Sequence, residues 1–225
     1  MLFGFLHLPT LFYTFMICGM ILYIVIEFRL TSDERRPSTS IEVEELCRVA
    51  REGDVIGVAY RSKRAGLVKV FTGSEWTHCA FLHWTSSELV VVEVARYGDA
   101  IDGVVETPLA EWLDRHRRCI VAYRGVSPHS VTPQAVDAFI EEHRAAKTDV
   151  NVVHWLKTMV RRRWGRERVK SRYYCSEFVV RFLQSMDIMT KKYDPASYKP
   201  WELVYGRLPL ANGISYRDAR IIKYD

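Results

Sequence analysis

The stretch Tyr174-Cys175-Ser176-Glu177-Phe178 is the most informative part of this chain, because a cysteine stands directly before an amphipathic helix. Apolar residues follow at 178, 179, 182, 183 and 186, which is the spacing of one helical face. We therefore expect Cys175 in the first turn of that helix, where free N–H groups and the helix dipole favour a thiolate and could hold an oxyanion. From position alone, a buried cysteine that merely starts a helix is the simpler interpretation, so catalysis requires a base nearby.

A cysteine nucleophile needs a histidine, and the chain has seven. Five of them have surroundings that do not suggest a catalytic base. His7 lies in an apolar N-terminal segment, His116 in a solvated run of arginines, His129 in a loop, and His143 and His154 on helix faces. The other two, His78 and His83, lie in a β-rich run over residues 77–84. Side chains alternate along a strand, so these two histidines point to opposite faces.

A second β-rich run, over residues 88–95, follows a short Thr-Ser-Ser connection, and together the two runs predict a hairpin. Glu93 lies between Val92 and Val94, and an acid inside an apolar strand needs a partner if it is buried. His78 and Glu93 share a face if they are directly opposite or one step diagonal, whereas a slip of one residue separates them. The hairpin alone leaves this register open.

The remaining pattern predicts an α+β domain with one mostly antiparallel sheet flanked by helices. Besides the helix after Cys175, we expect helices at 42–50, after Thr107-Pro108, after Thr132-Pro133 and at 150–160. Further strands are expected at 55–60, 119–123 and 214–224.

Four short elements, taken in order, resemble the circularly permuted NlpC-like branch of the papain-like enzymes. They are Gly53-Asp54-Val55-Ile56, Trp76-Thr77-His78-Cys79-Ala80, an acid in the next strand, and Tyr174-Cys175-Ser176-Glu177-Phe178. The branch includes the bacterial YiiX group and a poxvirus relative, with lecithin retinol acyltransferase as a more distant member. As in this chain, its histidine strand precedes its cysteine helix. The resemblance spans roughly residues 50–205 and implies Cys175 as nucleophile, His78 as general base and Glu93 as the residue that orients the histidine.

The five cysteines are odd in number and form no CxxC pair, which argues against a disulfide framework and a structural zinc site. Three of them, Cys47, Cys79 and Cys119, lie in apolar segments and are interpreted as small core residues. We expect neither a metal nor a cofactor.

The N-terminal segment predicts a membrane anchor over residues 1–30. Residues 2–26 contain no charged side chain, and neither a positive n-region nor a small-residue cleavage site marks a removable signal peptide. The arginines Arg29, Arg35 and Arg36 all follow the span, which predicts a single-pass protein with its domain in the cytosol. Residues 31–42 are expected to form a polar linker and residues 43–225 the thiol-enzyme domain.

The net charge is +5, and the excess gathers between residues 157 and 172. This stretch predicts contact with an anionic lipid or an acidic substrate through Lys157, Arg161, Arg162, Arg163, Arg166, Arg168, Lys170 and Arg172. Nucleic-acid binding is disfavoured because no nucleic-acid-binding motif accompanies the charge.

The sequence therefore predicts a membrane-anchored thiol amidase, peptidase or acyltransferase. Cys175 would form a thioester with an amide or ester substrate, which could be lipid-linked. The alternative is a catalytically inactive, membrane-held binding module with the same fold.

Overall fold

A seven-stranded sheet forms the centre of the protein. The computed structural model describes residues 36–60, 74–98, 100–127, 130–149, 171–192 and 194–224, with the single residues 18, 19, 22, 69 and 72. The strand order is β1 (Thr39–Glu42), β11 (Arg220–Lys223), β6 (Ile120–Arg124), β2 (Val55–Ala59), β3 (His78–Trp84), β4 (Leu89–Tyr97) and β5 (Ile101–Pro108). Strands β1 and β11 are parallel, and every other neighbouring pair in this sheet is antiparallel.

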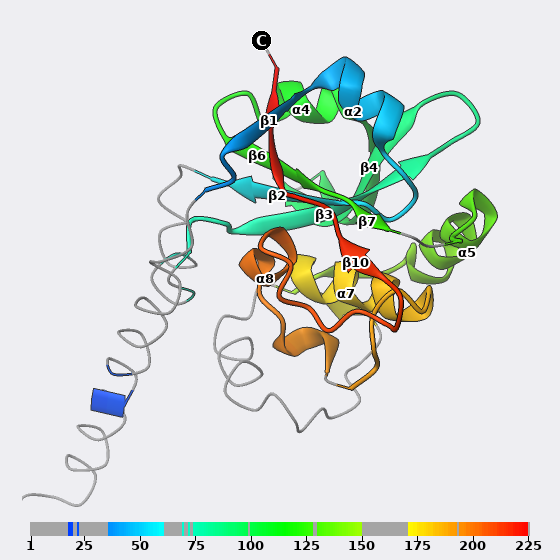
Figure 1. Ribbon diagram of the computed structural model, residues 1–225. Coiled ribbons are helices and arrows are strands. Elements are labelled where there is room, and N and C mark those ends of the chain that lie inside the picture. The colour runs from blue at the N-terminus through cyan, green and yellow to red at the C-terminus, as the bar shows by residue number, and fades with distance from the viewer. Residues whose placement is uncertain are drawn as a thin grey trace, which may run out of the picture.

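Helices cover both faces of the sheet (Figure 1). Helices α2 (Val43–Val49) and α4 (Leu109–Arg115) lie above it in this view, and α5 (Pro133–His143), α7 (Cys175–Ser185) and α8 (Pro200–Val204) lie below it. A short 3-10 helix, η1 (Pro195–Ser197), precedes α8. Two small ladders complete the fold, formed by β7 (Val126–Ser127) with β10 (Ser215–Tyr216) and by β8 (Lys147–Thr148) with β9 (Arg172–Tyr173).

Strand β3 contributes to a separate apolar layer on each face of the sheet. Cys79 and Phe81 belong to the apolar layer between the sheet and α7, where the rings of Phe81 and Phe182 stack with centroids 4.0 Å apart. Ala80 and Leu82 belong to the layer between the sheet and helices α2 and α4 on the opposite face. This alternation places His78, the first residue of β3, on the α2 and α4 side.

The β3–β4 hairpin has the diagonal register. Phe81–Trp84 pair with Leu89–Val92, and Thr85 N–H donates to Glu88 O at 3.0 Å across the four-residue loop. Extended by three residues, this register would set His78 opposite Ala95 and so diagonal to Glu93 on one face of the sheet. The ladder itself ends at the Phe81–Val92 pair, so His78 and Cys79 lie beyond its end.

Two sequence-based boundaries need correction. Residues 39–42, expected in the polar linker, form β1, because they find backbone partners in β11 at the far end of the chain. Thr107 was expected to cap a helix, but it lies in β5 and pairs with Val91 of β4. Helix α4 follows Pro108 without a side-chain cap. Thr132 does cap α5, its hydroxyl accepting from Ala135 N–H at 3.3 Å.

Several sequence-based predictions fall on residues that the structure does not describe. They are the helix at 150–160, the basic stretch apart from Arg172, and the anchor over residues 1–30 apart from Cys18, Gly19 and Leu22. Within the described residues, no helix combines the length and the apolar character needed to cross a bilayer.

Candidate active site

Cys175 is the first residue of α7 and is partly buried. The preceding residue, Tyr174, is extended and provides no side-chain cap, while its carbonyl accepts the first helical hydrogen bond from Phe178 N–H at 3.0 Å. The N–H groups of the first turn, including that of Cys175 itself, have no acceptor within the helix. Cys175 therefore has the helix-start position that its sequence predicts.

His78 and Glu93 are joined by a short hydrogen bond. His78 Nε2–H donates to Glu93 Oε2 at 2.5 Å, and the side chains are 12% and 0% exposed respectively. His78 and Cys175 each shift the pKa of the other towards its charged form, so the imidazole and the thiol lie near each other. Because Nε2 is engaged by Glu93, Nδ1 is the nitrogen left for the sulfur. The structure thus brings together all three residues singled out from the sequence.

The Glu93 carboxylate is held from its other side by two further donors. Tyr97 Oη donates to Glu93 Oε1 at 2.5 Å, and Trp112 Nε1 donates to the same oxygen at 2.9 Å. Burial by itself raises the pKa of Glu93, but hydrogen bonds from His78, Tyr97 and Trp112 bring it below its ordinary value. The carboxylate therefore stays ionised at neutral pH and fixes the orientation of the His78 ring.

The thiol and the imidazole favour each other's charged form. A hydrogen bond from Cys79 and the charge of His78 lower the pKa of Cys175 well below its ordinary value, against the opposing effect of burial. Burial by itself lowers the pKa of His78, but the Cys175 thiolate and the Glu93 carboxylate raise it to about 10. The site therefore favours a thiolate beside an imidazolium, the reactive form of a cysteine nucleophile.

Cys79 is a contact of the nucleophile that sequence reasoning assigned to the core. It is fully buried, and hydrogen bonding from it helps to lower the pKa of Cys175. Burial is the main reason why its own pKa is raised well above the ordinary value, so Cys79 is a neutral thiol. It directly follows His78 beyond the end of the β3–β4 ladder, and it belongs to the apolar cluster against which Cys175 packs.

His116 is buried, and its interpretation as a solvated residue is wrong. It follows α4, where its ring stacks on Trp112 with centroids 4.0 Å apart, so the neighbouring arginines do not determine its exposure. His116 Nδ1–H donates to Trp112 O at 2.7 Å, which leaves Nε2 to accept from Tyr60 Oη at 2.7 Å. Burial lowers the pKa of His116 and keeps it neutral. The Tyr60 ring in turn lies 5.9 Å from the His78 ring, between centroids.

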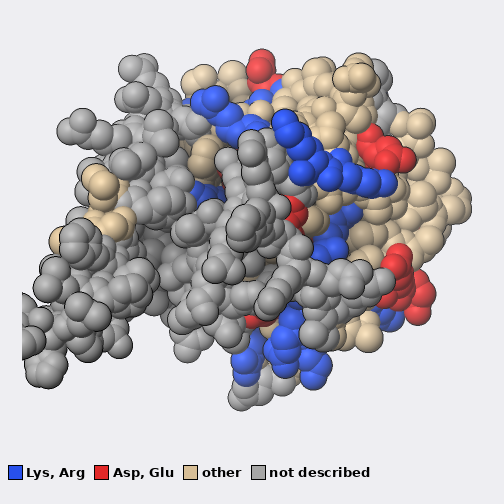
Figure 2. All heavy atoms as spheres, turned by 90° about the horizontal axis from the view of Figure 1, so that it is seen from below, with Lys and Arg blue, Asp and Glu red and all other residues tan. Residues whose placement is uncertain are grey.

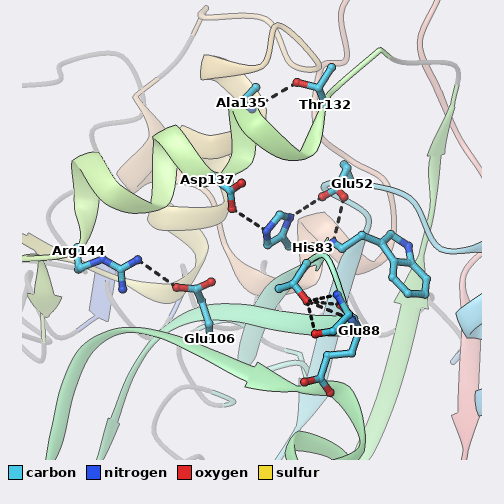
Figure 3. A network of polar contacts seen from close by, with 11 residues as sticks. Glu52, His83, Glu88, Glu106, Thr132, Ala135, Asp137 and Arg144 are labelled. Atoms are coloured by element: carbon cyan, nitrogen blue, oxygen red, sulfur yellow. Dashed lines mark hydrogen bonds and ion pairs between the residues drawn. The ribbon is translucent and has the colours of Figure 1, made fainter.

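His83, the other histidine of β3, belongs to a separate network (Figure 3). Its Nδ1 contacts Glu52 Oε2 at 2.8 Å and its Nε2 contacts Asp137 Oδ1 at 3.0 Å. Glu52 also accepts from Trp84 N–H at 3.0 Å. With both ring nitrogens bound to carboxylates, His83 links the turn before β2 to helix α5 and has no nitrogen left for Cys175.

The Gly53-Asp54 element has a structural role. Gly53 has a positive φ of 77°, which glycine adopts without strain. The Asp54 carboxylate, fully buried, accepts from Tyr123 Oη at 2.7 Å, from Val126 N–H at 2.9 Å and from Arg217 Nη2 at 2.7 Å. It therefore ties β2 to β6, β7 and the approach to β11.

Sequence reasoning missed Cys79, Tyr97 and Trp112 as parts of this site. One local signal was present, because Tyr97 lies four residues after Glu93 and so on the same strand face. No such signal marks Trp112, which reaches Glu93 from α4. Among the described residues, no group of three or more His, Cys, Asp or Glu side chains is arranged to hold a metal ion.

Comparison with known proteins gives one family. The model of the permuted papain-like amidase enzymes, YaeF/YiiX, C92 family, matches residues 49–197. A crystal structure of the metalloprotein yiiX from Escherichia coli O157:H7 is 18% identical, with a TM-score of 0.45, over 76% of this chain and 88% of that chain. A search of curated proteins finds no match.

Proposed function

This chain belongs to the permuted papain-like amidases of the C92 family, and on that premise we propose that it is a cysteine amidase in which Cys175 is the nucleophile. The observation that carries the proposal is the Cys175–His78–Glu93 arrangement, with its thiolate, its imidazolium and its buried carboxylate.

In the first half of the reaction, the Cys175 thiolate attacks the carbonyl carbon of an amide. The oxyanion that develops is stabilised by N–H groups of the first turn of α7. His78 Nδ1–H then protonates the leaving nitrogen, the C–N bond breaks, and a thioester remains on Cys175.

In the second half, the neutral His78 takes a proton from water, and the resulting hydroxide attacks the thioester. The C–S bond breaks and the thiolate returns beside the reprotonated imidazole. Throughout both halves, Glu93 keeps Nε2 protonated and Nδ1 directed at the sulfur.

Two finer parts of the proposal concern the acceptor and the location. An acceptor other than water would make the enzyme an acyltransferase through the same thioester. A membrane anchor at residues 1–30 and the basic residues at 157–172 would place it at an anionic lipid surface. Lys and Arg side chains also gather among the described residues on the face seen from below (Figure 2), which is compatible with such a surface.

The test uses a panel of acyl and peptidyl thiol probes on the full chain in detergent, followed by hydrolysis rates on the amide that the panel identifies. Cys175→Ala and His78→Ala should each abolish turnover, and the double variant should be no worse than either, because groups that act as a unit are not additive. Cys47→Ala is the matched control, since Cys47 packs against the opposite layer. Circular dichroism checks folding. Full activity in folded Cys175→Ala would exclude the thiol mechanism, whereas a wild type that is not labelled at Cys175 and hydrolyses no amide of the panel would favour the binding module.

A further inference from the structure

A closed cycle of side-chain contacts includes the histidine of the site. The Glu93 carboxylate accepts from His78 Nε2–H at 2.5 Å and from Trp112 Nε1–H at 2.9 Å. Trp112 stacks on His116 with ring centroids 4.0 Å apart, and His116 Nε2 accepts from Tyr60 Oη at 2.7 Å. The Tyr60 ring then returns to the His78 ring, with centroids 5.9 Å apart and planes tilted by 52°. Residues from β3, β4, the end of α4 and the position after β2 are thus connected around one imidazole.

The hydrogen bond to Glu93 does not by itself fix the His78 ring. The second side-chain torsion of a histidine is broad, so a contact at Nε2 alone lets the ring swing about that atom. Such a swing moves Nδ1 away from the thiol. The His78 side chain is 12% exposed, so the surrounding core does not hold it on every side. Tyr60 is in ring contact with His78 and limits this movement.

We propose that Tyr60 is a positioning residue for His78 and that His116 holds Tyr60 in place, an inference that rests on the proposed pairing of His78 with Cys175. The Tyr60 hydroxyl needs an acceptor to fix its ring, and a neutral His116 supplies one. His116 Nδ1–H donates to Trp112 O at 2.7 Å, which leaves a lone pair on Nε2. His116 is 2% exposed, and burial disfavours the charged form that would turn this acceptor into a donor.

Core packing alone does not account for this pair of polar groups. Tyr60 is only partly buried and packs at the margin of the layer beneath α2 and α4. A buried imidazole costs free energy unless its nitrogens are paired, and an apolar side chain could fill the same space without that cost. Both ring nitrogens of His116 lead to the site, one through Tyr60 and the other through Trp112. The polar pair therefore serves orientation.

The experiment follows alkylation of Cys175 by iodoacetamide as a function of pH, read on tryptic peptide 173–181 of the full chain in detergent. Tyr60→Phe and His116→Phe each keep a ring but remove the hydrogen bond between the two residues. At pH 6 to 7 each variant should react about two- to tenfold more slowly than wild type, the effect of one lost hydrogen bond on the thiolate that His78 stabilises. Near pH 10 the rates should converge, because the thiol then ionises without help.

Two further variants separate positioning from packing. The double variant Tyr60→Phe/His116→Phe should react no more slowly than the slower single variant, because both changes remove the same bond. His116→Gln offers the Tyr60 hydroxyl an acceptor again and should react faster than His116→Phe.

Tyr224→Phe is the matched control. Tyr224 packs against the same layer as Tyr60, and its hydroxyl donates to His116 O at 2.9 Å and to Cys119 O at 3.2 Å. Its loss should leave the pH profile of Cys175 unchanged. Thermal unfolding checks each variant, and the comparison of Tyr60→Phe with Tyr224→Phe decides the question even where His116→Phe does not fold.

The assay needs no substrate, so it separates this inference from the proposed function. Wild-type Cys175 that reacts no faster than Cys47 at pH 7 would overturn both. A fast wild type that Tyr60→Phe matches at every pH would overturn the positioning role alone. So would a loss of rate by the same factor at every pH, or an equal loss in Tyr224→Phe, because each is the result of a general packing defect.

Discussion

Replacing Glu93 by Gln tests how the protonation of His78 is controlled. In the wild type one carboxylate oxygen accepts from His78 Nε2–H, and the other accepts from both Tyr97 and Trp112. Glutamine has a single oxygen and cannot serve both sides. If that oxygen faces Tyr97 and Trp112, the amide NH₂ faces Nε2 of His78 and forces the proton onto Nδ1. A neutral imidazole with its proton on Nδ1 cannot take the proton of the thiol.

The reverse orientation of the amide is less stable. It points NH₂ at the indole N–H of Trp112, and leaving that buried donor without an acceptor costs about 1–3 kcal/mol. This corresponds to a roughly 5- to 150-fold preference for the unproductive arrangement. The lost negative charge beside the imidazolium adds to this effect, and a wrong imidazole tautomer lowers turnover by up to about 10⁴-fold in a related triad. We therefore expect Glu93→Gln to lower turnover by about 10²- to 10⁴-fold.

A substrate-free assay follows the alkylation of Cys175 by iodoacetamide on peptide 173–181. At pH 6 to 7, Glu93→Gln should react at least about tenfold more slowly than wild type, because the imidazolium that stabilises the thiolate is weakened. The double variant Glu93→Gln/Trp112→Phe should react faster than Glu93→Gln alone, because the indole no longer dictates the amide orientation. Trp112→Phe alone is the control for the smaller side chain, with thermal unfolding as a check. Wild-type reactivity of Glu93→Gln, or no recovery in the double variant, would refute the reasoning.

Three further outcomes are expected. Alkylation of wild-type Cys175 should already be fast at pH 7 and should change again near pH 10, where His78 loses its proton. Cys47 should react slowly at pH 7, because burial and the charge of Glu44 raise its pKa. Equal alkylation rates of Cys175 and Cys47 at pH 7 would argue against the pairing of thiolate and imidazolium. Burial lowers the pKa of His83, but Glu52 and Asp137 raise it above about 6.5 overall. Protonated His83 should therefore stabilise the folded state by about 1–3 kcal/mol. This stabilisation should be complete below about pH 6.5 and lost as the pH rises through the folded pKa. Urea unfolding of wild type against His83→Gln measures this, and a stability difference that grows with pH would contradict it. The full chain should stay with membranes after carbonate extraction, and release of the intact chain into the supernatant would contradict the anchor.

Local patterns predicted much of the fold. Strands β2, β3, β4 and β6 and helices α2, α5 and α7 follow from period-2 and helical spacing, which depend only on neighbouring residues. The strands β1 and β5 were missed. Strand β1 is stabilised by β11 from the opposite end of the chain. The alternation along β5 is interrupted by Gly103, which has a φ of 152° and lies close to the carbonyl oxygen of Ala146. Such long-range partners leave no periodic signal in a single sequence.

The candidate site shows the same division. Alternation separates His78 from His83, but it cannot say which face of the strand the cysteine helix approaches. That depends on the hairpin register and on where the ladder ends, both of which are properties of the paired strands. The resemblance to a permuted papain-like family supplied the choice of His78, because the matching element Trp76-Thr77-His78-Cys79-Ala80 names this histidine independently of register.

The end of the β3–β4 ladder explains how residues from two layers share one site. His78 and Glu93 point to the side of α2 and α4, whereas Cys175 belongs to α7 on the other face. A fully paired sheet would separate them by its own backbone. Pairing between β3 and β4 stops at Phe81 and Val92, and the two residues that lower the pKa of Cys175, His78 and Cys79, lie beyond that point although their side chains alternate. The end of the β3–β4 ladder thus lies where the nucleophile of one layer and its base from the other come together.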